Sequence, residues 1–287
     1  MRKNTISRRC FVCGTASAIA GAILANSPVS AQQNQNRAIN DPNIIFENVE
    51  YKSGDKMIGG YLARPKKKGK YRAVAVIPGT WMIEPYIAET TAMVAQAGFV
   101  GLAIDVFNFF PKVKTYEETD TIAWETTRDL VKKYYTNENT LRDVQAGMDF
   151  LKQQKFVKGK HFGVTGFCGG GWLGLLAASQ IKEIGAVVPF YAPVNLKLPN
   201  RKTPMDVAGQ IKVPVQGHYG TKDQGIPIED VKKFEETLKA QKTKIEIFTY
   251  DAGHGFFAYN RDESYNAEAA KLAWSRSIEF FKQNLKT

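Results

Sequence analysis

Cysteine and histidine are scarce in this chain, with three residues of each among 287. Cys10 and Cys13 lie near the N-terminus, in a segment that we expect to be removed, so the mature chain would keep only Cys168. One cysteine cannot form an internal disulfide, which excludes a disulfide-stabilised fold. The few histidines and cysteines also show no metal-ligand spacing, so we expect neither a metal nor an organic cofactor.

Long apolar runs are also missing. The apolar stretch from Phe11 to Ala25 is shorter than the about 20 residues that a transmembrane helix needs, so we expect no stable membrane anchor. It follows Arg8-Arg9 and precedes small residues at 29–31, which together predict an export signal of the twin-arginine type over residues 1–31. An ordinary secretory signal or an uncleaved amphipathic tail are the alternatives. The predicted location is the bacterial periplasm or the exterior.

An excess of acidic residues is absent as well. The chain has 39 basic and 28 acidic residues and a net charge of +11, which becomes +7 without the four basic residues of the signal. The densest basic run, at 64–72, contains a single aromatic residue, Tyr71, and matches no nucleic-acid motif. We interpret it as a solvated loop and expect no nucleic-acid partner. The sequence does not indicate an oligomeric state.

Alternating apolar runs and helical periodicity fill the rest of the chain. Residues 32–41 are polar and are predicted to be a flexible lead-in, and 42–287 to be a single catalytic domain. Such alternation predicts an α/β fold with a mostly parallel sheet and helices on both faces. Strands are expected at 43–51, 56–64, 72–77, 99–105, 161–167, 186–192, 213–220 and 244–250, and helices at 86–97, within 117–154, and at 170–181, 229–240 and 265–285.

Three reactive side chains follow predicted strands of this sheet. Active groups in parallel sheets lie on loops at the carboxyl ends of strands. Cys168, Asp223 and His254 each occupy such a loop, and they occur in the order nucleophile, acid, histidine. The other two histidines, His161 and His218, are expected to be structural. We therefore predict a catalytic triad of Cys168, Asp223 and His254.

The glycines around Cys168 allow two interpretations. Gly166-Phe167-Cys168-Gly169-Gly170 fits a nucleophile elbow, in which small neighbours permit a strained turn and the following helix favours a thiolate. Residues 169–174 also match G-x-G-x-x-G, which would indicate a nicotinamide-dependent oxidoreductase. That fingerprint needs an acidic residue about 20 positions on, and the following strand supplies none. The elbow is the preferred interpretation.

At these residues the chain resembles the dienelactone hydrolase family. GFCGGG is similar to that family's elbow, GTKDQGIP to its acid loop and AGHGF to its histidine loop. The resemblance spans roughly residues 43–285 and implies an α/β-hydrolase fold. It also implies hydrolysis of a small ester or lactone through a thioester, with Cys168 as nucleophile, His254 as base and Asp223 orienting it. The amides of Gly169 and Thr80 would hold the oxyanion. A non-catalytic or acyl-transferring member of the same fold is the alternative.

Two departures from the family's pattern concern the substrate and the thiol. The family usually has a glutamate against the resting thiol where this chain has Gly79, and the offset of nearby Glu84 does not fit that role. The family's dienelactone-cleaving members bind a substrate carboxylate with arginines. One of these is missing near Asn108, while Arg261 matches the other. We therefore expect a more apolar ester, bound by Arg261 and by the aromatic residues Trp81 and Phe107.

Overall fold

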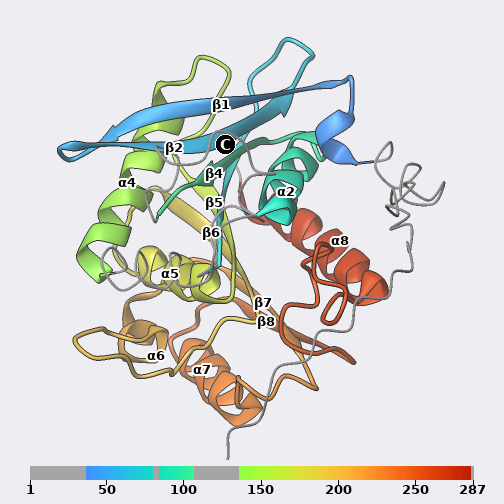
Figure 1. Cartoon of the computed structure of the whole chain (residues 1–287). Coiled ribbons are helices and arrows are strands. Elements are labelled where there is room, and N and C mark those ends of the chain that lie inside the picture. Colours follow the sequence, from blue (N-terminus) through green and yellow to red (C-terminus); the bar gives the residue numbers. More distant parts are fainter. Residues whose placement is uncertain (1–36, 80–83, 107–135, 286–287) are drawn as a thin grey trace, which may run out of the picture. The chain divides into compact units, whose positions relative to one another are not determined.

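A sheet of eight strands organises the part of the chain that the computed structural model describes, which comprises residues 37–79, 84–106 and 136–285 (Figure 1). The predicted signal, Thr80, Trp81 and Phe107 lie outside these ranges. The strand order is β1-β2-β4-β3-β5-β6-β7-β8. Strand β2 runs antiparallel to both of its neighbours, and all other neighbouring pairs are parallel. The strands are β1 (Ile44–Ser53), β2 (Lys56–Pro65), β3 (Ala73–Ile77), β4 (Val100–Ile104), β5 (Phe162–Phe167), β6 (Ile184–Phe190), β7 (Val215–Gly220) and β8 (Ile245–Tyr250).

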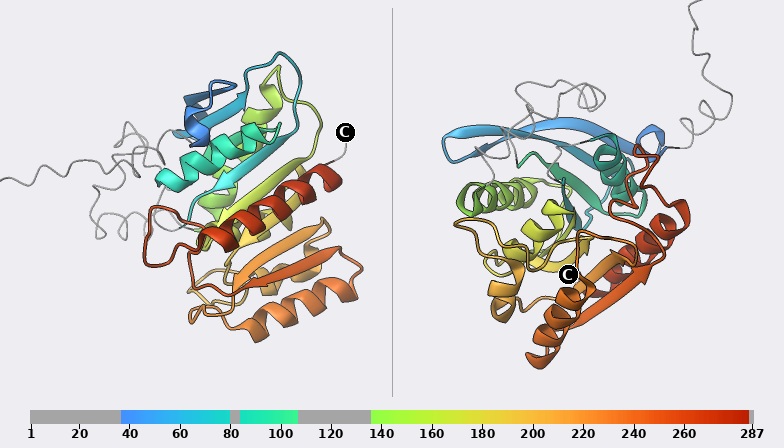
Figure 2. Two further views of the ribbon diagram at one scale, coloured as in Figure 1. Left: turned by 90° about the vertical axis from the view of Figure 1, so that its right-hand side faces the viewer. Right: turned by 60° about the horizontal axis from the view of Figure 1, so that its bottom comes forward.

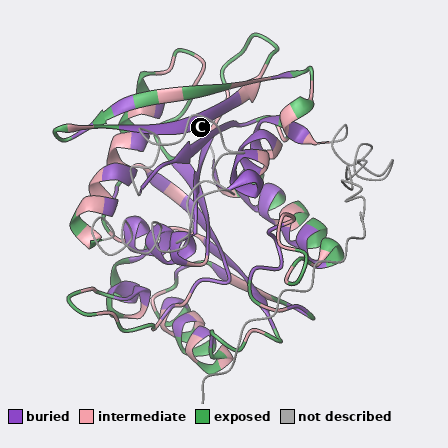
Figure 3. Cartoon of the chain, in the orientation of Figure 1, coloured by how far each residue is buried: buried purple, intermediate pink, exposed green. Residues whose placement is uncertain are grey.

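Helices cover both faces of this sheet, as Figure 2 shows. Helices α2 (Pro85–Gln96) and α8 (Ala267–Asn284) lie on one face, and α4 (Asn137–Gln153), α5 (Gly169–Ala178) and α7 (Ile228–Ala240) lie on the other. Every residue of β3, β4 and β5 is buried between these layers (Figure 3). Burial on both faces explains why these strands are continuous apolar runs rather than alternating ones. The α/β fold with a mostly parallel sheet is therefore confirmed.

Short elements were the ones that the sequence pattern did not predict. Helix α6 (Pro204–Val207) and the 3-10 turn η3 (Ala208–Gln210) are too short to show periodicity. Within the expected flexible lead-in, Ala38–Asn40 form a further 3-10 turn, η1. The backbone amides of Ala38 and Ile39 donate to the Glu89 carboxylate at 2.6 and 3.2 Å. A side chain from α2 thus anchors a turn that lies within the expected lead-in.

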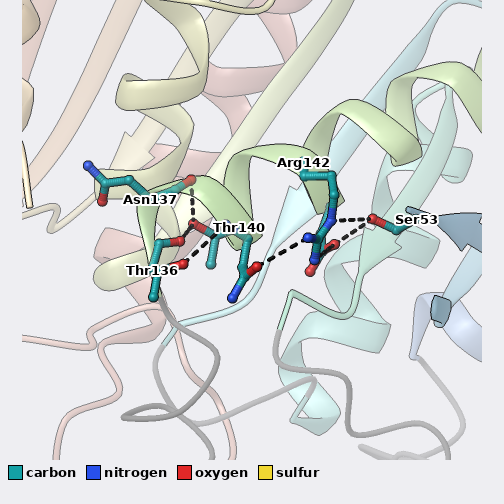
Figure 4. Close-up of polar contacts among 7 residues, drawn as sticks. Ser53, Thr136, Asn137, Thr140 and Arg142 are labelled. Carbon is teal, nitrogen blue, oxygen red and sulfur yellow. Dashed lines mark hydrogen bonds and ion pairs between the residues drawn. The ribbon is translucent and has the colours of Figure 1, made fainter. Parts of the chain in front are cut away.

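A polar cluster joins the start of α4 to the end of β1 (Figure 4). Thr136 caps the helix by accepting the Asn139 amide at 3.1 Å. Farther along, the Ser53 hydroxyl donates to buried Asp143 at 2.5 Å, and the Arg142 guanidinium reaches both of them. These bonds fix the antiparallel β1–β2 hairpin to the helix layer. None of the helices in the described ranges is sufficiently long and apolar to span a bilayer.

Candidate active site

The turn between β5 and α5 has the geometry of a nucleophile elbow. Cys168 occupies it with φ 51° and ψ −118°, a backbone conformation that side chains rarely adopt and that costs energy. A Cβ atom on Gly166 would lie 2.3 Å from the Gly170 carbonyl oxygen, and one on Gly170 would lie 2.3 Å from the Pro78 carbonyl oxygen. Glycine is therefore required on both sides of Cys168, which explains the spacing seen in the sequence.

Helix α5 starts directly after the thiol. Gly169 is its first residue, and the Trp172 amide donates to the Cys168 carbonyl at 3.0 Å. The Cys168 amide donates to the Phe190 carbonyl at 2.9 Å, which ties the elbow to the end of β6. Cys168 is half-buried, so the sulfur lies at the positive end of the helix dipole without being sealed in the core. Such a position suits a nucleophilic thiolate.

An aspartate and a histidine from two other strands complete the group. Asp223 follows β7, and its Oδ2 accepts from His254 Nδ1 at 2.7 Å. The side chain of Asp223 is 2% exposed and that of His254 41% exposed. His254 also hydrogen-bonds the Cys168 side chain, and since Asp223 occupies Nδ1, we assign Nε2 to the thiol. The structure thus brings Cys168, His254 and Asp223 together, in the arrangement expected from their chain order.

The protonation of His254 follows from these partners. Burial by itself lowers the pKa of the imidazole, but hydrogen bonds to Asp223 and Cys168 outweigh it. The pKa of His254 is raised from 6.5 to about 10. At neutral pH the ring therefore carries a proton that it can transfer. In the resting protein, the ring beside the Cys168 sulfur is therefore a protonated imidazolium and not a neutral imidazole.

The histidines that were expected to be structural lie outside this group. His161 is exposed at the amino end of β5. His218 is fully buried in β7, where its Nδ1 lies 2.8 Å from the Tyr250 hydroxyl and its Nε2 lies 3.0 Å from that of Ser277. Because Ser277 donates to the Ala273 carbonyl, its oxygen accepts from Nε2–H. Burial and the nearby charge of Arg276 lower the pKa of His218 to about 3, so it is neutral.

A second charged group adjoins the thiol. Arg261 Nη2 contacts both carboxylate oxygens of Glu84 at 2.8 Å, and Nε donates to Oε1 at 3.1 Å. Glu84 is 8% exposed. The charges of Glu84, Arg261 and Cys168 all act on the buried Tyr86 hydroxyl, so the ion pair and the thiol share one neighbourhood. Glu84, to which the sequence assigned no role, is thus the partner of Arg261, the predicted substrate contact.

Gly79 lies beside the thiol, where the family's glutamate was expected. A Cβ atom at Gly79 would be 3.8 Å from the Cβ of Cys168 and 3.7 Å from the Tyr86 hydroxyl. A side chain here would face the nucleophile, as the resemblance implies, but glycine contributes no carboxylate. In the described ranges, no three His, Cys, Asp or Glu side chains gather as a metal site would require.

Tyr191 is a residue of this neighbourhood that the sequence reasoning missed. It directly follows β6, has φ 36°, and places its ring 5.0 Å from that of His254. The same rule that selected the triad, a polar residue at the carboxyl end of a strand, could have selected it. The apolar run around it concealed that signal.

Comparison with known proteins identifies the family. Residues 58–285 match the sequence profile of the dienelactone hydrolase family. The chain belongs to this family. A Methylorubrum extorquens protein named "Putative carboxymethylenebutenolidase" is 29% identical over 286 residues, covering 98% of this chain and 94% of that protein. A Bradyrhizobium protein named "Probable 2-oxo-3-(5-oxofuran-2-ylidene)propanoate lactonase" is 32% identical over 231 residues, covering 78% of this chain and 89% of that protein.

Solved structures agree with this assignment. A crystal structure from Klebsiella pneumoniae named "Putative Dienelactone Hydrolase" superposes with a TM-score of 0.75 and 28% sequence identity. The match covers 84% of this chain and 99% of that one. Dienelactone hydrolases have the α/β-hydrolase fold, and this chain is a dienelactone hydrolase-like hydrolase with the same fold.

Proposed function

We propose that this hydrolase cleaves a carboxylic ester or lactone through a thioester formed on Cys168. The observation that carries the proposal is the single imidazole of His254, which hydrogen-bonds both Asp223 and Cys168 at the elbow. A nucleophile, a proton carrier and a group that orients the carrier are the components that acyl transfer needs. The names of the two sequence relatives, a carboxymethylenebutenolidase and a lactonase, support this substrate class.

The first half-reaction forms the thioester. The Cys168 thiolate attacks the carbonyl carbon, a carbon–sulfur bond forms, and the carbonyl electron pair moves to oxygen. The backbone amide of Gly169 is one donor for this oxyanion, because it begins the helix next to the sulfur. When the adduct collapses, the carbon–oxygen bond to the leaving group breaks, and that oxygen takes the proton of His254.

The second half-reaction releases the acid. His254, now neutral, accepts a proton from water while the water oxygen attacks the thioester carbonyl. The carbon–sulfur bond breaks, the sulfur regains its electron pair, and the carboxylic acid leaves. Asp223 keeps Nδ1 of the ring protonated and directed toward the carboxylate in both halves, so that Nε2 stays aimed at the reacting atoms.

The ion pair of Glu84 and Arg261 bears on the choice of substrate. Glu84 neutralises the guanidinium through three contacts of 2.8 to 3.1 Å. A substrate carboxylate would have to displace Glu84 to reach Arg261, which costs the free energy of the existing pair. We therefore infer a preference for an uncharged ester or lactone. Comparing kcat/KM for a neutral ester and for its carboxylate-bearing analogue measures this preference.

Cys168→Ala tests the thiol chemistry. The variant removes the nucleophile, leaves the elbow backbone unchanged, and should lower kcat/KM for p-nitrophenyl acetate by at least about 10³-fold. Mass spectrometry of the native enzyme, quenched during turnover, should show an acyl adduct on Cys168. Substantial activity in the Cys168→Ala protein, with circular dichroism unchanged, would contradict the proposal.

A further inference from the structure

Tyr191 packs against the ring of His254, and its hydroxyl is buried without a hydrogen-bond partner among the described residues. Tyr191 is 2% exposed, and its oxygen is shielded from solvent. Buried polar atoms are nearly always paired, because an unpaired one loses its bonds to water without replacement. Next to the ring of the proposed base, a bound substrate can supply the missing bond. This hydroxyl is therefore a candidate for a contact to the substrate.

Besides its unpaired hydroxyl, Tyr191 has a strained backbone conformation. Its φ of 36° lies in the left-handed region, where a tyrosine costs energy. Its amide donates to the His218 carbonyl at 2.7 Å, so the end of β6 is fixed on the neighbouring strand while the side chain turns aside. Strain of this kind persists where it serves a site. A positive φ also occurs at Cys168, which directly follows the adjacent strand β5.

The position of Tyr191 in the sheet indicates whether its hydroxyl would contact the oxyanion or the leaving-group oxygen of a bound ester. Strand β6 adjoins β5 on the side opposite β3, and the loop after β3 begins at Pro78 and Gly79. The proposed oxyanion donor, the backbone amide of Gly169, begins α5 directly after Cys168. The Tyr191 ring instead lies 5.0 Å from the ring of His254, which delivers the proton to the leaving group.

The charges around this hydroxyl determine its protonation. Burial, followed by the charge of Cys168, raises the pKa of Tyr191 well above its usual range, although Arg261 opposes this. The phenol therefore keeps its proton at neutral pH. It can donate a hydrogen bond but cannot act as a base.

The geometry points to Tyr191 as a further catalytic residue, whose hydroxyl donates a hydrogen bond to the leaving-group oxygen of the bound ester. The inference rests on the proposed thioester chemistry. As the carbon–oxygen bond breaks, its electron pair moves to the oxygen, which takes a proton from His254. Tyr191 keeps its own proton and stabilises the charge that builds on that oxygen. The benefit grows with the charge, so it is greatest for esters of poorly acidic alcohols.

The test is the Tyr191→Phe variant, measured on two acetate esters. For ethyl acetate, whose leaving oxygen bears most of the developing charge, kcat/KM should fall about 10- to 100-fold. For p-nitrophenyl acetate, whose leaving group delocalises the charge, the loss should stay within about threefold. Equal losses on both esters, or no loss on either, would overturn the inference. Thermal stability should be equal to or above that of the native enzyme, because an unpaired buried hydroxyl is removed.

Tyr51→Phe is the matched control. The Tyr51 hydroxyl is also buried and unpaired among the described residues, but the charges that act on it are those of Asp105 and Asp143. Its removal should leave both rates unchanged. A Tyr191→Phe protein that loses stability together with activity would point to a structural role and contradict ours. Cys168→Ala in the same assay separates the two proposals: if it is inactive while Tyr191→Phe is fully active on both esters, only the role of Tyr191 fails.

Discussion

His218 lies in β7 and His254 in the loop after the neighbouring strand β8, yet their environments shift their pKa values in opposite directions. His218 is fully buried with two hydroxyl groups as its partners, and burial followed by the charge of Arg276 lowers its pKa to about 3. His254 is bonded to a carboxylate and to a thiol at the half-open rim of the sheet, and its pKa is raised to about 10. The comparison teaches that neutral partners make a histidine a part of the core, whereas acidic partners make it a proton donor.

The largest effect is expected from replacing Asp223, the acidic partner of His254. Asp223→Asn replaces the carboxylate by an amide and removes the charge that holds His254 protonated and correctly oriented. We expect kcat/KM to fall by about 10²- to 10⁴-fold. Steady-state kinetics on p-nitrophenyl acetate measures the loss, with urea unfolding as the control for stability. Retention of more than about a tenth of the native activity would mean that Asp223 does not orient the base.

The converse experiment addresses the core histidine. His218→Leu keeps a similar volume but removes the partner of Tyr250 and of Ser277, so the free energy of unfolding should fall by roughly 2–3 kcal/mol. Activity should remain within about threefold of the native value, because no atom of His218 side chain contacts Cys168 or His254 in the hydrogen-bond network described. Urea unfolding and ester hydrolysis on the same preparation check both halves. A loss of activity without a loss of stability would contradict the prediction, because it would mean that His218 contributes to catalysis and not to the core.

Acid titration gives the smallest and most specific effect. The pKa of His218 is about 6.5 in the unfolded state and is lowered to about 3 in the folded state. Between these two values the unfolded chain binds a proton at this residue and the folded chain does not. This group should therefore lower the free energy of unfolding as pH falls from 6.5 toward 3, by at most about 1.4 kcal/mol per pH unit.

The native protein and His218→Leu provide the measurement. Their difference in unfolding free energy should narrow as pH is lowered, and parallel curves would show that His218 is not held neutral. The contribution of His254 to the free energy of unfolding changes with pH in the opposite direction, because its pKa is raised on folding. The stability that it contributes is complete below pH 6.5 and is lost as pH rises toward 10.

Much of the fold could be predicted from the sequence because buried parallel strands are continuous apolar runs. The order of Cys168, Asp223 and His254 after such strands was enough to predict that they meet, since parallel strands end at one edge. The preference for a hydrolase over a nicotinamide-dependent oxidoreductase was also correct, as the family match shows. The proximity of the three side chains was therefore a consequence of topology.

Two features of the site could not be predicted in this way. The pairing of Glu84 with Arg261 joins the start of α2 to the loop after β8, and linear offset says nothing about such a long-range contact. The strained backbone of Tyr191 and its unpaired hydroxyl are properties of packing, which an apolar run does not reveal. Sequence patterns can predict which loops lie at the same edge of the sheet, but the hydrogen-bond partners of a side chain depend on tertiary contacts that only the structure shows.

The contact between α5 and the end of β3 has a consequence for engineering. A Cβ atom on Gly170 would lie 2.4 Å from the Ile77 carbonyl oxygen as well as close to that of Pro78. The helix that follows Cys168 thus touches the end of β3, and neither can shift alone. Libraries aimed at new substrates should leave the glycines of the elbow intact and vary Glu84 and Arg261, whose side chains can change without displacing the backbone.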